Sequence, residues 1–135
     1  MFTPTFSSQT MDISVINVLL GRHVALWSEA DEAKRTPVVA EIYTEDIYFV
    51  DPFFVVSGQA QISSFIADLL RKHPGYVFRI TGSIEAHHNV AYLSWQFGPP
   101  DTPAAITGHD VFVLADERIQ QIYTFINGVT ASTGH

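Results

Sequence analysis

The chain of 135 residues contains no cysteine, which excludes disulfide bonds, thiolate metal sites and cysteine nucleophiles. Cations are few: seven lysines and arginines stand against 14 acidic residues, a net charge of −7, and they form no basic stripe. We therefore do not expect binding to a nucleic-acid backbone. No run of 18 apolar residues is present, so we expect no membrane partner. The lack of cysteine fits the reducing cytoplasm, where we expect the protein to be.

Apolar residues are abundant. They make up 47% of the chain and include ten phenylalanines, five tyrosines and two tryptophans. At this length they suffice for one core, because two domains would each have too little apolar surface to bury. We expect a single domain over residues 12–128, with a flexible lead-in at 1–11 and a flexible tail at 129–135.

The first half of the chain has helical spacing. Apolar side chains recur every three or four residues over 12–30 and again over 62–73. Between them, Thr36 as an N-cap and Pro37 as the first helical residue predict a short second helix. The segment 47–56 is β-branched and aromatic around an Asp-Pro pair, which indicates a short hairpin.

The second half has the alternating pattern of strands. Four segments, 76–86, 90–97, 104–115 and 118–127, are separated by turn residues and predict an antiparallel meander. This order of elements predicts an α+β fold, in which three helices pack on a cone-shaped, curved antiparallel sheet. The wide end of such a cone is expected to enclose an apolar pocket for a small apolar ligand.

Two aspartates interrupt apolar patterns. Asp110 shares a strand face with Gly108 and Phe112, and burial there favours the neutral acid, which can donate a hydrogen bond. The alternative is a carboxylate held by backbone amides or by a serine or threonine. Asp51 ends an apolar run just before Pro52; it is a second candidate, and its alternative is an ordinary Asp-Pro turn.

Aromatic side chains near these aspartates are candidate pocket walls. Trp95, Tyr123 and Phe125 lie on late strands, where they either line a pocket or fill the core. The other face of the sheet is expected to carry Val111, Val113, Ile122 and Ile126. That much exposed apolar surface predicts a homodimer through the outer face of the sheet.

Metal and cofactor motifs are lacking. The adjacent pairs His87–His88 and His109–Asp110 point to opposite faces of a strand, so neither can chelate one metal ion. The sequence also has no glycine-rich phosphate loop and no Gly-x-Ser-x-Gly nucleophile elbow. We expect neither a metal nor an organic cofactor.

Four motifs in order carry a resemblance: AEIYTEDIYFVDPF, the Ser57-Gly58 turn, the segment 108–112 (GHDVF), and Arg118-Ile119 before a strand. Over about residues 13–127 the chain resembles the nuclear transport factor 2-like superfamily, in its SnoaL-like and ketosteroid isomerase branch. The resemblance implies that Asp51 is a base and that a protonated Asp110 binds an enolate oxygen. In SnoaL-type cyclases, Asp110 itself would be the acid/base.

One position departs from the isomerases, which carry an oxyanion-donating tyrosine on the first helix. Trp27, 24 residues before Asp51, stands there, and Tyr43 or Tyr123 are possible substitutes. The implied function is a cofactor-independent acid/base enzyme for a small apolar carbonyl compound, of isomerase or polyketide-cyclase type. The alternative is a non-catalytic ligand-binding or dimerisation module. The expected pocket residues are Trp27, Tyr43, Trp95, Phe112, Tyr123 and Phe125.

Overall fold

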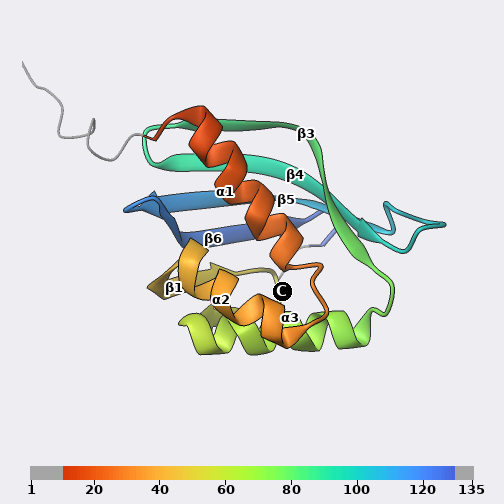
Figure 1. The fold of residues 1–135 in the computed structure, drawn as a ribbon. Helices are drawn as coiled ribbons and strands as arrows, with labels where there is room; N and C mark the ends of the chain where they lie inside the picture. Colours follow the sequence, from red (N-terminus) through yellow and green to blue (C-terminus); the bar gives the residue numbers. More distant parts are fainter. Residues whose placement is uncertain (1–10, 130–135) are drawn as a thin grey trace, which may run out of the picture.

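Three helices and two strands come first along the chain, and a meander of four strands follows (Figure 1). The structure, a computed structural model, describes residues 11–129, so nearly all of the predicted flexible ends, 1–11 and 129–135, lies outside it. The helices are α1 (Ile13–Leu26), α2 (Glu32–Ile42) and α3 (Gln59–Lys72). The strands are β1 (Tyr43–Val50), β2 (Val55–Ser57), β3 (Val77–His87), β4 (Val90–Gly98), β5 (Ile106–Ala115) and β6 (Arg118–Ile126).

The second helix begins earlier than the sequence predicts. Its N-cap is Asp31, whose side chain accepts the Ala33 N–H at 2.9 Å, so the helix starts at Glu32. Thr36 and Pro37 therefore lie inside α2, where the Thr36 hydroxyl donates to the Glu32 carbonyl at 3.0 Å. Aspartate and threonine are both good N-cap residues, and here Asp31 caps the helix instead of Thr36. The first helix is correspondingly shorter than predicted and ends at Leu26.

The sheet has six strands in the order β2-β1-β6-β5-β4-β3 and is mixed. Every neighbouring pair is antiparallel except β1 and β6, which run parallel. The α+β prediction is confirmed, but the sheet is not wholly antiparallel as expected. The long connection through α3 and β3–β5 returns the chain beside β1 in the same direction, which a tight hairpin cannot do.

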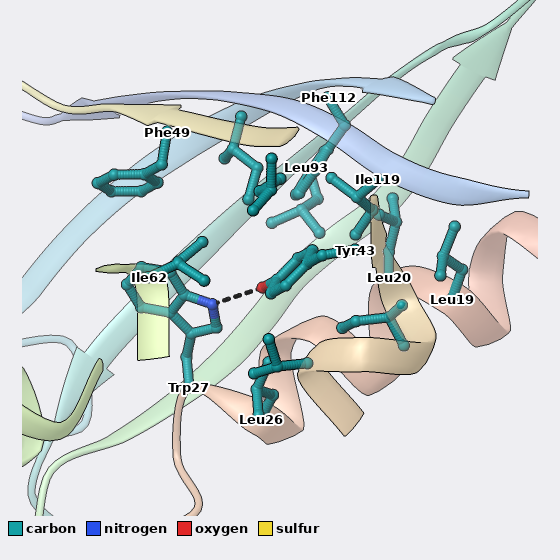
Figure 2. Close-up of a cluster of buried hydrophobic side chains, with 14 of the residues drawn as sticks. Leu19, Leu20, Leu26, Trp27, Tyr43, Phe49, Ile62, Leu93, Phe112 and Ile119 are labelled. Atoms are coloured by element: carbon teal, nitrogen blue, oxygen red, sulfur yellow. Dashed lines mark hydrogen bonds between the residues drawn. The ribbon is translucent and has the colours of Figure 1, made fainter. Parts of the chain in front are cut away.

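The helices cover one face of this sheet, and α1 lies across it (Figure 1). Fully buried side chains from α1, α3 and most strands make one core, which includes Leu20, Ile62, Leu93, Phe112 and Ile119 (Figure 2). Within residues 11–129, no helix is both long and apolar enough to span a membrane.

The register of β5 and β6 corrects the predicted faces of β6. Residues paired directly across two strands share a face, and the pairs are Asp110 with Thr124 and Phe112 with Ile122. Ile122 is therefore buried, and Ile126 also faces inward and lines a cavity. Tyr123 and Phe125 lie on the outer face, opposite to their prediction. Both faces of β6 carry apolar residues, so periodicity alone could not distinguish inside from outside.

The predicted homodimer stays a prediction, now on a changed surface. Without Ile122 and Ile126, the outer face keeps Val111 and Val113 and gains Phe125, 53% exposed and stacked on His109. Light scattering at micromolar concentration is expected to give the mass of a dimer, and Phe125→Ser is expected to shift it toward monomer. Val18→Ser, a similarly exposed apolar site on α1, is the control. A monomeric mass for the unmodified protein would contradict the prediction.

Candidate functional site

A cavity of about 110 Å³ lies between the inner face of the sheet and helices α1 and α3. Its wall is mainly apolar and includes Val24, Phe49, Phe65, Phe78 and Ile126. Four side chains with titratable or hydroxyl groups interrupt this wall: His23, Asp51, Asp110 and Thr124. Both predicted catalytic aspartates thus line one apolar cavity, as do Trp27 and Trp95.

The size of this cavity limits which compounds could fit inside it. An engineered apolar cavity of about 150 Å³ admits benzene. The cavity here is slightly smaller but is open to solvent. It suits a compound with a single small ring, whereas a four-ring steroid would need the wall to move.

Asp110 lies on β5 and is only 6% exposed. Its Oδ1 accepts two hydrogen bonds, from the Trp95 indole N–H at 3.0 Å and from the Thr124 hydroxyl at 2.7 Å. The threonine contact matches part of the alternative interpretation of this residue. Oδ2 makes no hydrogen bond within residues 11–129 and lies 3.8 Å from His23 Nε2. One carboxyl oxygen is therefore fixed and the other is free to meet a ligand.

Asp51 lies on the loop between β1 and β2. Its Oδ1 accepts the backbone N–H groups of Phe53 at 2.8 Å and Phe54 at 2.7 Å. This is the Asp-Pro turn that the alternative interpretation describes. The same side chain lines the cavity, and in the described part of the chain Oδ2 has no hydrogen-bond partner. Asp51 thus caps a turn and also presents one oxygen at the site.

A buried hydrogen-bonded chain joins Trp27, Tyr43 and His23. The Trp27 indole N–H donates to the Tyr43 hydroxyl at 2.8 Å (Figure 2), and this hydroxyl lies 2.6 Å from His23 Nδ1. Burial raises the pKa of Tyr43 far above its usual value, and the hydrogen bond from Trp27 lowers this pKa by a smaller amount. The hydroxyl therefore keeps its proton.

Four of the six predicted pocket residues lie away from the cavity. Tyr43 and Phe112 are fully buried in the core, and the Phe112 ring packs edge-on against His23 with ring centroids 5.1 Å apart. Tyr123 and Phe125 are on the outer face of the sheet. Neither Trp27 nor Tyr43 can give its proton to a ligand without breaking the chain of bonds just described.

His23, like Thr124, is a polar residue of the site that the sequence did not predict. It is 4% exposed and projects from α1 into the cavity wall. Its signal was the spacing Ile16-Leu20-His23-Trp27, which places a histidine on the buried stripe of the helix. Among residues 11–129 no group of three histidine, aspartate or glutamate side chains could hold a metal ion.

Comparison with known proteins places this chain in a family. The model of the SnoaL-like domain matches residues 21–122. A candidate isomerase of the SnoaL-like family from Agrobacterium tumefaciens str. C58 is 30% identical and has a TM-score of 0.80; the match covers 85% of this chain and 99% of that one. No curated protein matches the sequence at a significant level.

Two more distant structures share the fold. A candidate ketosteroid isomerase from Kribbella flavida DSM 17836 has 14% identity and a TM-score of 0.65, over 90% of this chain and 84% of that one. A candidate SnoaL-like polyketide cyclase from Jannaschia sp. CCS1 has 17% identity and a TM-score of 0.63, over 81% and 85%. The chain belongs to the SnoaL-like domain family of the nuclear transport factor 2-like superfamily.

Proposed function

We propose that this protein is a cofactor-independent acid/base enzyme that acts on a small apolar carbonyl compound through an enolate, as an isomerase or a polyketide cyclase does. One observation carries the proposal: Asp51 and Asp110 line the same apolar cavity, and each keeps one oxygen free of hydrogen bonds within the described chain. The candidate isomerase at 30% identity supports the same class of reaction.

The proposed reaction moves one proton. Asp51 Oδ2 removes a proton from the carbon next to the substrate carbonyl, and the electron pair of that C–H bond forms the enolate. Asp110 in its acid form donates a hydrogen bond to the enolate oxygen. Its acid proton lies on Oδ2, because Oδ1 already accepts from Trp95 and Thr124. Asp51 then returns the proton to a different carbon, which isomerises the substrate.

Replacing Asp51 by asparagine tests this role. The asparagine oxygen can still accept the Phe53 and Phe54 N–H groups, so the turn persists, but no basic oxygen remains. We expect turnover to fall about 10²–10⁴-fold with ligand affinity unchanged. The assay is the isomerisation of one-ring unsaturated ketones, starting with 3-cyclohexenone, followed by NMR in D₂O.

The matched control is Asp68→Asn, an exposed aspartate of α3 that pairs with Arg71. It is expected to keep full activity. If Asp51→Asn converts an active ketone as fast as the unmodified protein, Asp51 is not the base.

A non-catalytic binding module is the second candidate. It is favoured by the turn-capping bonds of Asp51, which explain that residue without chemistry, and by the engagement of the Trp27 indole with Tyr43. The same assay separates the two. A module would bind ring compounds in the cavity but would neither isomerise any ketone nor exchange its α-protons with D₂O.

A further inference from the structure

We propose that His23 is a second donor to the enolate oxygen, through its Nε2–H, beside Asp110. The inference rests on the proposed enolate chemistry and adds a catalytic residue to it. It also explains how the site can stabilise an oxyanion although neither Trp27 nor Tyr43 has a proton free for the substrate.

The first support is that His23 is held in one orientation. Its ring is edge-on to Phe112, with centroids 5.1 Å apart, and tilted against Trp27 at 5.7 Å. The side chain is 4% exposed and lines the cavity, so its remaining nitrogen, Nε2, is directed at the site where Asp110 lies. A donor fixed before the substrate arrives costs little reorganisation during the reaction.

The second support is the position of the imidazole proton. The buried Tyr43 hydroxyl accepts the indole proton of Trp27 and has one proton of its own to donate. Within residues 11–129, its only other hydrogen-bond partner is His23 Nδ1, which must accept that proton. A neutral imidazole that accepts at Nδ1 carries its hydrogen on Nε2. Trp27 and Tyr43 are thus positioning residues that select the tautomer.

The third support is the distance between the two donors. His23 Nε2 and Asp110 Oδ2 are 3.8 Å apart, which is too long for a hydrogen bond between them. It is also less than twice a hydrogen-bond length of about 2.8 Å. One oxygen atom can therefore lie within reach of both donors. A neutral histidine is known to polarise a carbonyl in this way in an isomerase of unrelated fold.

The tautomer can be read directly in the unmodified protein. ¹⁵N NMR of the His23 ring is expected to show a protonated, pyrrole-like Nε2 and an unprotonated, pyridine-like Nδ1. In Tyr43→Phe the hydroxyl that donates to His23 Nδ1 is absent, so a mixture of the two tautomers is expected. A proton on Nδ1 in the unmodified protein would overturn the inference without any reference to activity.

Ligand binding tests the donor itself. The probe is 4-nitrophenol, as the anion, compared by calorimetry with nitrobenzene, which has the same ring but no hydroxyl. We expect the unmodified protein to bind 4-nitrophenol more tightly than nitrobenzene. In His23→Leu the affinity for 4-nitrophenol is expected to fall about 10- to 100-fold, the usual effect of one hydrogen bond to a charged group. Nitrobenzene affinity is expected to stay nearly constant. The control, His87→Leu at the exposed end of β3, is expected to change neither affinity.

The outcomes separate this inference from the proposed function. No preference for 4-nitrophenol in the unmodified protein would overturn both. A preference that survives in His23→Leu but disappears in Asp110→Leu would overturn the role of His23 alone and leave the enolate site intact. Loss of the preference in both variants, with the Nε2–H tautomer observed, supports the inference.

Discussion

Asp110→Leu is expected to slow turnover about 10²–10³-fold, the usual cost of removing one oxyanion donor. Leucine has the same branched shape but no polar atom, so the enolate oxygen loses the donor at Oδ2. The Trp95 N–H and the Thr124 hydroxyl also lose their acceptor. The measurement is the rate of ketone isomerisation for folded protein, with folding checked by circular dichroism.

Two further variants separate the free oxygen from the fixed one. Asp110→Asn keeps an acceptor for Trp95 and Thr124 and offers a weaker amide donor, so it is expected to lose less activity than Asp110→Leu. Thr124→Val removes one bond to Oδ1 and leaves Oδ2 in place. It is expected to have the smallest effect of the three. If Thr124→Val is as slow as Asp110→Leu, Asp110 acts through packing and not as a donor.

Gly108→Ala is expected to destabilise the protein by about 3 kcal/mol, at the upper end for an added methyl group in a packed core. Gly108 pairs with Trp95 across β4 and β5. A β-carbon there would clash with the Phe125 carbonyl oxygen, which belongs to the backbone, and with the Trp95 indole ring. Urea unfolding measures the loss.

The same substitution is expected to reduce activity. The displaced indole is the group that donates to Asp110 Oδ1 at 3.0 Å, so moving it loosens the carboxyl. The matched control is Gly21→Ala in α1, where the added carbon meets no atom within 4 Å. There alanine is expected to stabilise the helix by about 0.5–1 kcal/mol. Equal stability of the Gly108→Ala and unmodified proteins would contradict the prediction, because it would mean that the strands move apart at little cost.

The sequence predicts most of the fold because its apolar spacing is clear where one face alone is buried. Helix α3 is such an element. The inner face of β5, with Asp110 beside Phe112, is also as predicted. In β6 both faces carry apolar or aromatic residues, so the pattern could not tell that Ile122 points inward and Phe125 outward. Only the pairing with β5 decides this.

The site is predictable in part for a similar reason. Asp51 and Asp110 stand out because each carries a charge in an apolar run. His23 does not, because a histidine on a helix is compatible with a surface position. Its role depends on a contact with Tyr43, 20 residues further along the chain, that no local pattern contains. The same contact explains why Tyr43 is in the core and not, as predicted, at the pocket.

The proposed function depends on Asp110 binding the oxygen of the ligand inside the cavity. A crystal structure of the protein with 4-nitrophenol tests it most directly. The ring is expected to lie in the cavity, with the phenolate oxygen at about 2.8 Å from Asp110 Oδ2. A ring bound with its oxygen directed away from Asp110, toward solvent, would contradict the claim.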